Sequence, residues 1–81
     1  MRVLKFSASW CGPCKMLSRN LEDVSTIIPI EDIDIDDNQD AAIEYGVRGV
    51  PTMIMLDENN AEVKRLVGMQ PLKQLQDWFN D

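Results

Sequence analysis

Hydrophobic and polar positions in the first half of the chain predict a strand, a helix and a second strand. The stretch VLKFSA (3–8) alternates weakly between apolar and polar residues and predicts a strand. Over 15–28, apolar residues recur at steps of four, three and four, which gives a helix one apolar face. That face holds Leu17, Leu21, Val24 and Ile28. The stretch 28–36 predicts a second strand, because Ile33 and Ile35 alternate with acidic residues.

The second half of the chain predicts a short helix, a hairpin and a last helix. Residues 36–38 are two aspartates and an asparagine, candidate caps for a helix that contains 41–45. The stretches 50–57 and 62–68 predict two strands, and the asparagine-rich turn ENNA between them makes a hairpin. Pro71 opens the last helix. Three apolar residues share a face of that helix: Leu72, Leu75 and Phe79.

This order, β-α-β-α-β-β-α, indicates an α/β fold. Two strands joined by a helix form a parallel, right-handed unit, whereas the two strands of a hairpin are antiparallel. We therefore expect a four-stranded mixed sheet with three flanking helices that cover both faces. A length of 81 residues suits one domain over 1–81.

Composition and charge narrow the possible functions. With 44% hydrophobic and 27% charged residues the chain has an ordinary globular balance, and its net charge of −6 favours neither nucleic acid nor an anionic membrane as a partner. No apolar run approaches the ~18 residues that span a bilayer, and no targeting segment is recognisable, so we expect a cytoplasmic protein. The chain has no histidine, so proton transfer at neutral pH needs a carboxylate, a lysine or a thiol with a shifted pKa.

The only two cysteines, Cys11 and Cys14, lie in the segment SWCGPCK, at the predicted start of the first helix. Zinc prefers four ligands, and two thiols without histidine would need carboxylates or a second chain to complete a site. A purely structural disulfide across so small a loop would remove little entropy from the unfolded chain. Redox chemistry explains the spacing better. The helix N-terminus favours a thiolate on Cys11, and Cys14, one turn further on, can attack a mixed disulfide formed there.

The acidic stretch DIDIDDNQDAAI (32–43) has the first, third and fifth carboxylates of a calcium-binding loop. Its sixth position is Asp37 instead of glycine, and its twelfth is Ile43 instead of glutamate. The alternation of isoleucines suits a strand better. We therefore expect neither a bound metal nor a cofactor.

Two separated motifs resemble the thioredoxin family. WCGPCK (10–15) is similar to the active-site signature of thioredoxins, and YGVRGVPT (45–52) is similar to the segment that leads into their cis-proline, here Pro51. A weaker match is Val67-Gly68, which resembles the glycine turn beside the substrate groove. The resemblance implies a thioredoxin-like fold of glutaredoxin-like size, without the extra N-terminal strand and helix of full-length members.

The resemblance also implies an activity, the reduction of protein disulfides. Cys11 would be the exposed attacking thiol of low pKa, and Cys14 the buried resolving thiol. Val50 and Pro51 would receive the substrate backbone. Further residues would form the groove around the cysteines: Trp10, Gly12, Pro13, Gly68 and Met69. The implied partners are disulfide-containing proteins such as ribonucleotide reductase, and a thioredoxin reductase; we expect a monomer. A glutaredoxin-like, glutathione-dependent reductase and a non-catalytic binding subunit that uses the same groove are the alternatives.

Four positions depart from the family pattern. Ser7 replaces a second tryptophan and Arg19 replaces a proline that often kinks the first helix. Lys5 stands where thioredoxins bury an aspartate that assists proton transfer at the resolving thiol, and Asp32 stands where they often have a lysine. We expect Lys5 and Asp32 to form a buried pair beneath the cysteines; alternatively, Lys5 reaches solvent and Asp32 is one of several surface acids. A paired ammonium there would favour the reduced form and raise the redox potential above the roughly −270 mV of thioredoxin.

Overall fold

The computed structural model describes residues 1–81 and contains four strands and three helices in the predicted order. The strands are β1 (Arg2–Ser7), β2 (Ile30–Asp34), β3 (Thr52–Leu56) and β4 (Glu62–Val67). The helices are α1 (Gly12–Leu21), α2 (Gln39–Glu44) and α3 (Leu72–Asn80). Strands β2 and β3 are shorter at both ends than the sequence pattern predicted.

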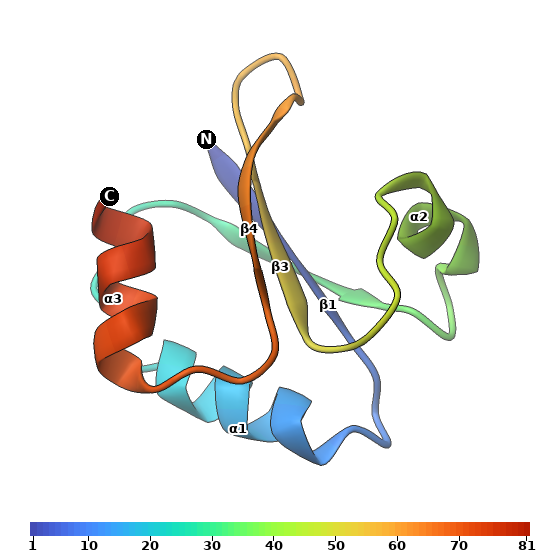
Figure 1. Ribbon diagram of the computed structural model, residues 1–81, viewed down its shortest axis with the longest axis horizontal. Coiled ribbons are helices and arrows are strands. Elements are labelled where there is room, and N and C mark those ends of the chain that lie inside the picture. Colours follow the sequence, from blue (N-terminus) through green and yellow to red (C-terminus); the bar gives the residue numbers. More distant parts are fainter.

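The strands form one mixed sheet in the order β2-β1-β3-β4. Strand β1 is parallel to β2 and antiparallel to β3, and β3 pairs with β4 in the predicted hairpin. Helices α1 and α3 lie on one side of the sheet and α2 on the other (Figure 1). The predicted four-stranded mixed sheet with helices on both faces is confirmed.

Alternation along the central strands divides the core between these two faces. On the α1/α3 face the buried cluster contains Val3, Leu17, Met53, Met55, Leu75 and Phe79. On the α2 face it contains Leu4, Phe6, Ile54 and Leu56. Every residue of β3 is buried, which accounts for its continuous apolar run.

The prediction that α1 extends to Ile28 is wrong, because the helix ends at Leu21. The segment that follows is rich in β-branched residues and leads into Pro29, which disfavours helical geometry in the residue before it. The backbone of Ser25 is instead paired with a side chain of α3: its N–H donates to Gln76 Oε1 and its carbonyl accepts from Gln76 Nε2, both at 2.9 Å. The apolar spacing correctly predicted that Val24 and Ile28 pack against the core, but it wrongly predicted a helical backbone there.

Helix α3 begins after Pro71 as predicted, yet its apolar face is narrower than the sequence indicated. Leu75 and Phe79 are buried, whereas Leu72 in the first turn is 40% exposed. Asn38 occupies the predicted cap position of α2, but its side chain makes no capping bond and donates to the carbonyl of Asp34 instead (3.0 Å).

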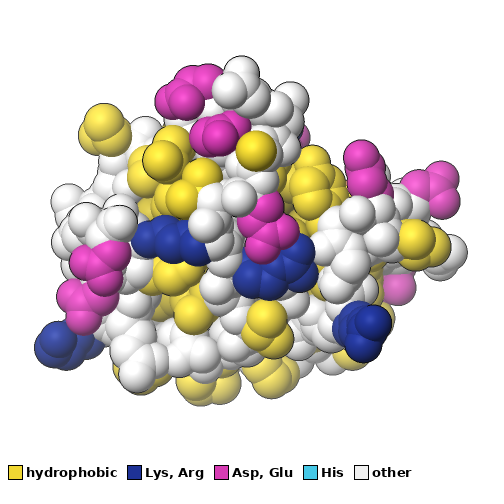
Figure 2. Space-filling model, turned by 45° about the horizontal axis from the view of Figure 1, so that its top comes forward, with side chains coloured by type: hydrophobic (Ala, Val, Ile, Leu, Met, Phe, Trp, Pro, Cys, Tyr) yellow, Lys and Arg dark blue, Asp and Glu magenta, His cyan; other side chains and the backbone are white.

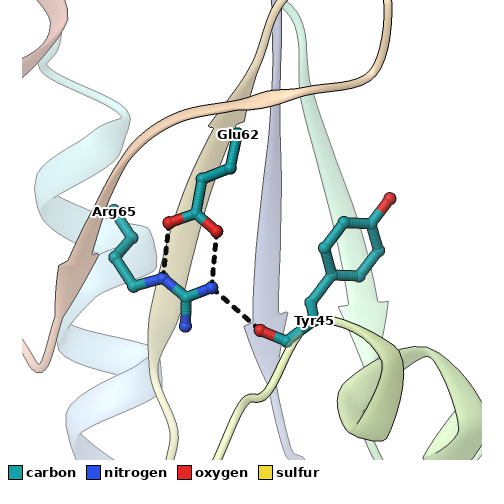
Figure 3. Close-up of polar contacts among 3 residues, drawn as sticks. All are labelled: Tyr45, Glu62 and Arg65. Atoms are coloured by element: carbon teal, nitrogen blue, oxygen red, sulfur yellow. Dashed lines mark hydrogen bonds and ion pairs between the residues drawn. The ribbon is translucent and has the colours of Figure 1, made fainter.

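Arg65 of β4 connects the hairpin to the segment after α2 (Figure 3). Its guanidinium forms two hydrogen bonds with the carboxylate of Glu62, at 2.7 and 2.6 Å, and donates to the carbonyl of Tyr45 at 2.8 Å. The hydrogen bonds from Arg65 lower the pKa of Glu62, and Glu62 in turn raises the pKa of Arg65. No helix has the length and apolar character required to cross a membrane.

Candidate active site

Cys11 and Cys14 form a disulfide at the N-terminus of α1. Cys11 is the N-cap of the helix, and its sulfur accepts a hydrogen bond from the backbone N–H of Cys14 at 3.1 Å. Pro13 occupies the first turn, where a proline sacrifices no helical hydrogen bond. The expected position of the cysteines at a helix start is confirmed, and the sulfur of Cys11 lies where free N–H groups and the helix dipole stabilise negative charge.

The expectation that Cys11 is exposed does not hold in this oxidised form. Cys11 is 4% exposed and Cys14 3%, and both pack in a small cluster with Ala8, Ile35 and Val50. The two sulfurs are bonded to each other, and Ile35 and Val50 pack against them. The neighbours Gly12 and Pro13 are exposed, so the cluster lies directly beneath the surface.

The segment before β3 faces the disulfide. The peptide bond between Val50 and Pro51 is cis, as the resemblance implied, and the carbonyl oxygen of Val50 lies 3.8 Å from the sulfur of Cys11. Gly68 follows β4 with a positive φ of 89°, a conformation that favours glycine. Its N–H donates to the carbonyl of Pro51 at 2.8 Å, which holds the end of β4 beside this segment.

The other predicted groove side chains differ in exposure and in their contacts. Trp10 is 67% exposed, and its indole N–H donates to the carboxylate of Asp36 at 3.0 Å. Met69 is only half-buried; it packs against the α1/α3 core, and Asn20 Nδ2 lies 3.7 Å from its sulfur. Val67 at the end of β4 is exposed. These predicted residues come from separate segments, because Trp10 directly precedes Cys11 whereas Met69 follows β4.

On the side of Asp36, the surface is acidic. Asp37, Asp40 and Glu44 lie in the same shallow depression as Asp36. Figure 2 shows acidic side chains on the right, the side where Figure 1 places α2, and others at the top and left. The stretch that resembles a calcium loop lies here, and no group of three or more acidic, cysteine or histidine residues is arranged to hold a metal ion.

Lys5 and Asp32 are adjacent on the paired strands β1 and β2, and their side chains form an ion pair at 2.8 Å. Only half of the predicted burial is found: the side chain of Lys5 is 7% exposed, whereas that of Asp32 is 71% exposed. The asymmetry follows from topology, because β1 is central in the sheet and β2 is an edge strand. The ammonium of Lys5 also donates to the hydroxyl of Ser18 on α1.

Two residues near the cysteines were missed by sequence reasoning, Ser18 and Asp34. Both line a cavity of about 220 Å³ that also contains Cys14. Two signals could have found them. Ser18 is four residues after Cys14 on a helix, and Asp34 is two residues after Asp32 on a strand, so each shares a face with a residue already singled out.

The site is a cysteine pair that can open and close at a helix start, with a cis-proline segment against it. This arrangement defines a thiol–disulfide oxidoreductase. The thioredoxin family model matches residues 1–81, and the chain belongs to the thioredoxin family.

Individual relatives agree with this assignment. The chain is 39% identical to a thioredoxin of Rickettsia typhi over 82 aligned residues, which cover 96% of this chain and 77% of the relative. It is 41% identical over 71 residues to an SPbeta prophage-derived thioredoxin-like protein, YosR, of Bacillus subtilis, with 88% and 86% covered. Among solved structures, a mutant thioredoxin from Halobacterium salinarum NRC-1 superposes with a TM-score of 0.87 at 39% identity, over 96% of this chain and 70% of that one.

The protein is thus a thiol–disulfide oxidoreductase that acts through its Cys11–Cys14 pair. Members of the family reduce disulfide-containing proteins and are themselves reduced by a thioredoxin reductase.

Proposed function

We propose that Cys11 is the attacking thiol and Cys14 the resolving thiol. The observation that carries this order is the hydrogen bond from the Cys14 N–H to the sulfur of Cys11 at the N-cap, because that N–H also stabilises a thiolate. The Cys11 thiolate attacks one sulfur of a substrate disulfide and displaces the other as a thiolate. The Cys14 thiol loses its proton and attacks Cys11. This closes the Cys11–Cys14 disulfide and releases the second substrate sulfur.

The substrate chain docks along the cis-proline segment by backbone pairing. The carbonyl of Val50 faces the sulfur of Cys11, so an extended peptide that pairs there would bring its own disulfide to the attacking atom. The remaining predicted groove residues add apolar and backbone contacts: Trp10, Gly12, Pro13, Pro51, Gly68 and Met69.

Lys5 and Asp32 tune the chemistry of the cysteine pair. The buried ammonium of Lys5 is held by Asp32 and by Ser18, which borders the same cavity as Cys14. Positive charge on this side stabilises a thiolate relative to a thiol and so favours the reduced protein. The expected result is a more oxidising protein than one with an aspartate at position 5.

We place this protein in the cytoplasm, as a single domain and a monomer. Its reductant would be a thioredoxin reductase and its substrates oxidised proteins, ribonucleotide reductase among them. The dipeptide Gly12-Pro13 favours this assignment over a glutathione-dependent reductase, as does the absence of a basic cluster for the carboxylates of glutathione.

Two measurements test the proposal. Insulin disulfide reduction is followed with NADPH and a thioredoxin reductase, and separately with glutathione and glutathione reductase; we expect turnover with the first system only. In parallel, Cys11→Ser and Cys14→Ser variants are mixed with a disulfide peptide. Cys14→Ser should accumulate a covalent mixed disulfide and Cys11→Ser should not. Trapping on Cys14 in the Cys11→Ser protein would reverse the order of attack, and groove binding that survives Cys11→Ser without any turnover by the wild type would favour a binding subunit.

A further inference from the structure

The resolving step needs a proton acceptor, and the position where this family carries a buried carboxylate holds Lys5. An ammonium cannot accept a proton, and the chain has no histidine. In the oxidised form Cys14 is only 3% exposed, so the closing step takes place at a largely covered sulfur. A carboxylate or a water path close to Cys14 would meet this need.

Asp34 is the carboxylate that lines the same cavity as Cys14. The cavity of about 220 Å³ beside α1 is lined by Cys14 and Asp34 together with Ser7, Ser9, Ser18 and Lys15. Strand pairing explains why Asp34 and Cys14 line the same cavity. Ser7 is opposite Asp34 in the parallel ladder, and the carbonyl of Ser7 accepts from the N–H of Ile35 at 2.9 Å. Because β1 and β2 are parallel, their carboxyl ends lie at the same edge of the sheet, where the cysteine turn begins.

The cavity has the properties that hold water. It is large enough for several molecules, and hydroxyl groups from three serines offer each of them polar partners. The carboxylate of Asp34 is also available to accept a proton. It forms no ion pair, and of its two carboxylate oxygens only Oδ1 has a protein donor, the N–H of Asp36 at 2.8 Å. Asp32, two residues earlier on the same face, is occupied by Lys5.

We propose that Asp34 accepts the proton of the Cys14 thiol through water in this cavity. The proton leaves the Cys14 sulfur and protonates the carboxylate as the sulfur bonds to Cys11. The bond between Cys11 and the substrate sulfur breaks, its electron pair stays with the substrate sulfur, and that thiolate then takes a proton from solvent. Two electrons pass from the cysteine pair to the substrate disulfide. In the reverse direction, protonated Asp34 returns the proton to Cys14.

Charged groups face this cavity from each neighbouring element. Lys15 comes from α1, Asp34 from β2, and the buried ammonium of Lys5 on β1 reaches it through Ser18. Asp32 partners that ammonium at the outer side.

The test separates the two chemical steps and rests on the proposed order of the cysteines. The reduced protein is mixed with an equimolar amount of 5,5′-dithiobis(2-nitrobenzoate), which releases one coloured thiolate on attack by Cys11 and a second on closure by Cys14. Asp34→Asn is the main variant, since its amide oxygen can still accept from the Asp36 N–H. Asp34→Glu restores a carboxylate. Asp37→Asn is the matched control, because it removes the same charge from an exposed position outside the cavity.

Asp34→Asn should leave the first phase unchanged and slow the second at neutral pH by at least about tenfold, toward the ~10²-fold that general acid–base catalysis commonly supplies. The difference should shrink at alkaline pH, because hydroxide then ionises the Cys14 thiol without the carboxylate. Asp34→Glu should recover most of the rate, and Asp37→Asn should match the wild type.

An unchanged second phase in Asp34→Asn overturns the proposal. A faster one does so as well, because a carboxylate that acts only through its field disfavours the Cys14 thiolate, and its removal would speed closure. Failure of the order of attack looks different: the first phase would then persist in Cys11→Ser, whatever residue stands at position 34.

Discussion

The two faces of β1 carry different kinds of residue, although the strand is central and buried on both. Toward α2 it presents Leu4 and Phe6, which belong to a wholly apolar cluster. Toward α1 it presents Val3, Lys5 and Ser7, so the side chains become polar along the strand as it approaches the cysteines. One face therefore supplies packing, and the other combines packing with the polar groups that surround the reactive sulfur. In so small a protein, both tasks are placed on one six-residue strand.

The largest effect is expected on the apolar face. Phe6 is fully buried among Leu4, Ile54 and Leu56, and its ring lies 5.9 Å from that of Tyr45. Phe6→Ala should lower the free energy of unfolding by about 3–5 kcal/mol, and Ile54→Val, as a milder change, by about 0.5–1.5 kcal/mol. Urea unfolding measures both. The redox potential of Ile54→Val should equal that of the wild type; a shifted potential would show that the two faces are not separate in function.

The next effect concerns the ion pair on the polar face. Asp32→Asn leaves the buried ammonium of Lys5 without its carboxylate and should cost about 1–2 kcal/mol, less than a fully buried pair because water reaches the exposed position 32. Lys5→Met fills the same volume and leaves Asp32 in water, so it should cost under about 1 kcal/mol.

The double variant completes a thermodynamic cycle for this pair. It should be no less stable than Lys5→Met alone, since Asp32 has nothing left to neutralise. Additive effects of the two single changes would mean that the contact contributes no coupling energy, and that Lys5 is held by Ser18 alone.

A smaller effect is expected on the redox potential. Because the ammonium of Lys5 favours thiolate near the cavity, the wild-type potential should lie above roughly −270 mV, and Lys5→Met should lower it by about 20 mV, close to 1 kcal/mol. Equilibration with glutathione buffers measures the potential of both proteins. A potential that does not change, or that rises, would remove Lys5 from the chemistry and leave it a structural role.

The smallest effect lies at the hairpin, away from both faces of β1. Since Arg65 lowers the pKa of Glu62 in the folded protein, this pair adds stability above the ordinary glutamate pKa of about 4.3, and the contribution is lost as the pH falls through the lowered folded value. Glu62→Gln should therefore cost less than about 0.5 kcal/mol at pH 7, as expected for an exposed pair. Unfolding measured from pH 5 downward should show the wild type and variant converge; a gap that widens in acid would contradict this account.

Most of the helices and strands could be predicted from hydrophobic spacing and turn residues, because neighbouring residues specify them. The alternation at Ile33 and Ile35 correctly predicted one strand, and the turn ENNA correctly predicted the hairpin. The end of α1 could not be predicted from the sequence pattern. Apolar spacing continues to Ile28, yet the backbone leaves the helix at Leu21 to pair with Gln76, a residue about fifty positions away.

In the candidate site, too, some features were predicted from the sequence and others depend on contacts between distant residues. Two motifs marked the cysteines and Pro51 in advance, and the exchange of charge between positions 5 and 32 was correctly read as an ion pair. The exposure of Asp32 was part of the alternative interpretation only, because it depends on which strand lies at the edge of the sheet. Asp34 was overlooked because the cavity that it shares with Cys14 arises from the pairing of β1 with β2; its position two residues after Asp32 was the only signal in the sequence.

The strand order also affects whether two copies of the protein can pair through their sheets. Strands β2 and β4 are the two open edges, and an open edge invites pairing with another chain. Strand β2 carries three carboxylates within five residues: Glu31, Asp32 and Asp34. Two such edges laid side by side would bring six carboxylates together. On each copy, only Lys5 and Arg2 form ion pairs with them. The acidic strand that lets Asp32 hold Lys5 thus also disfavours the pairing of two β2 edges.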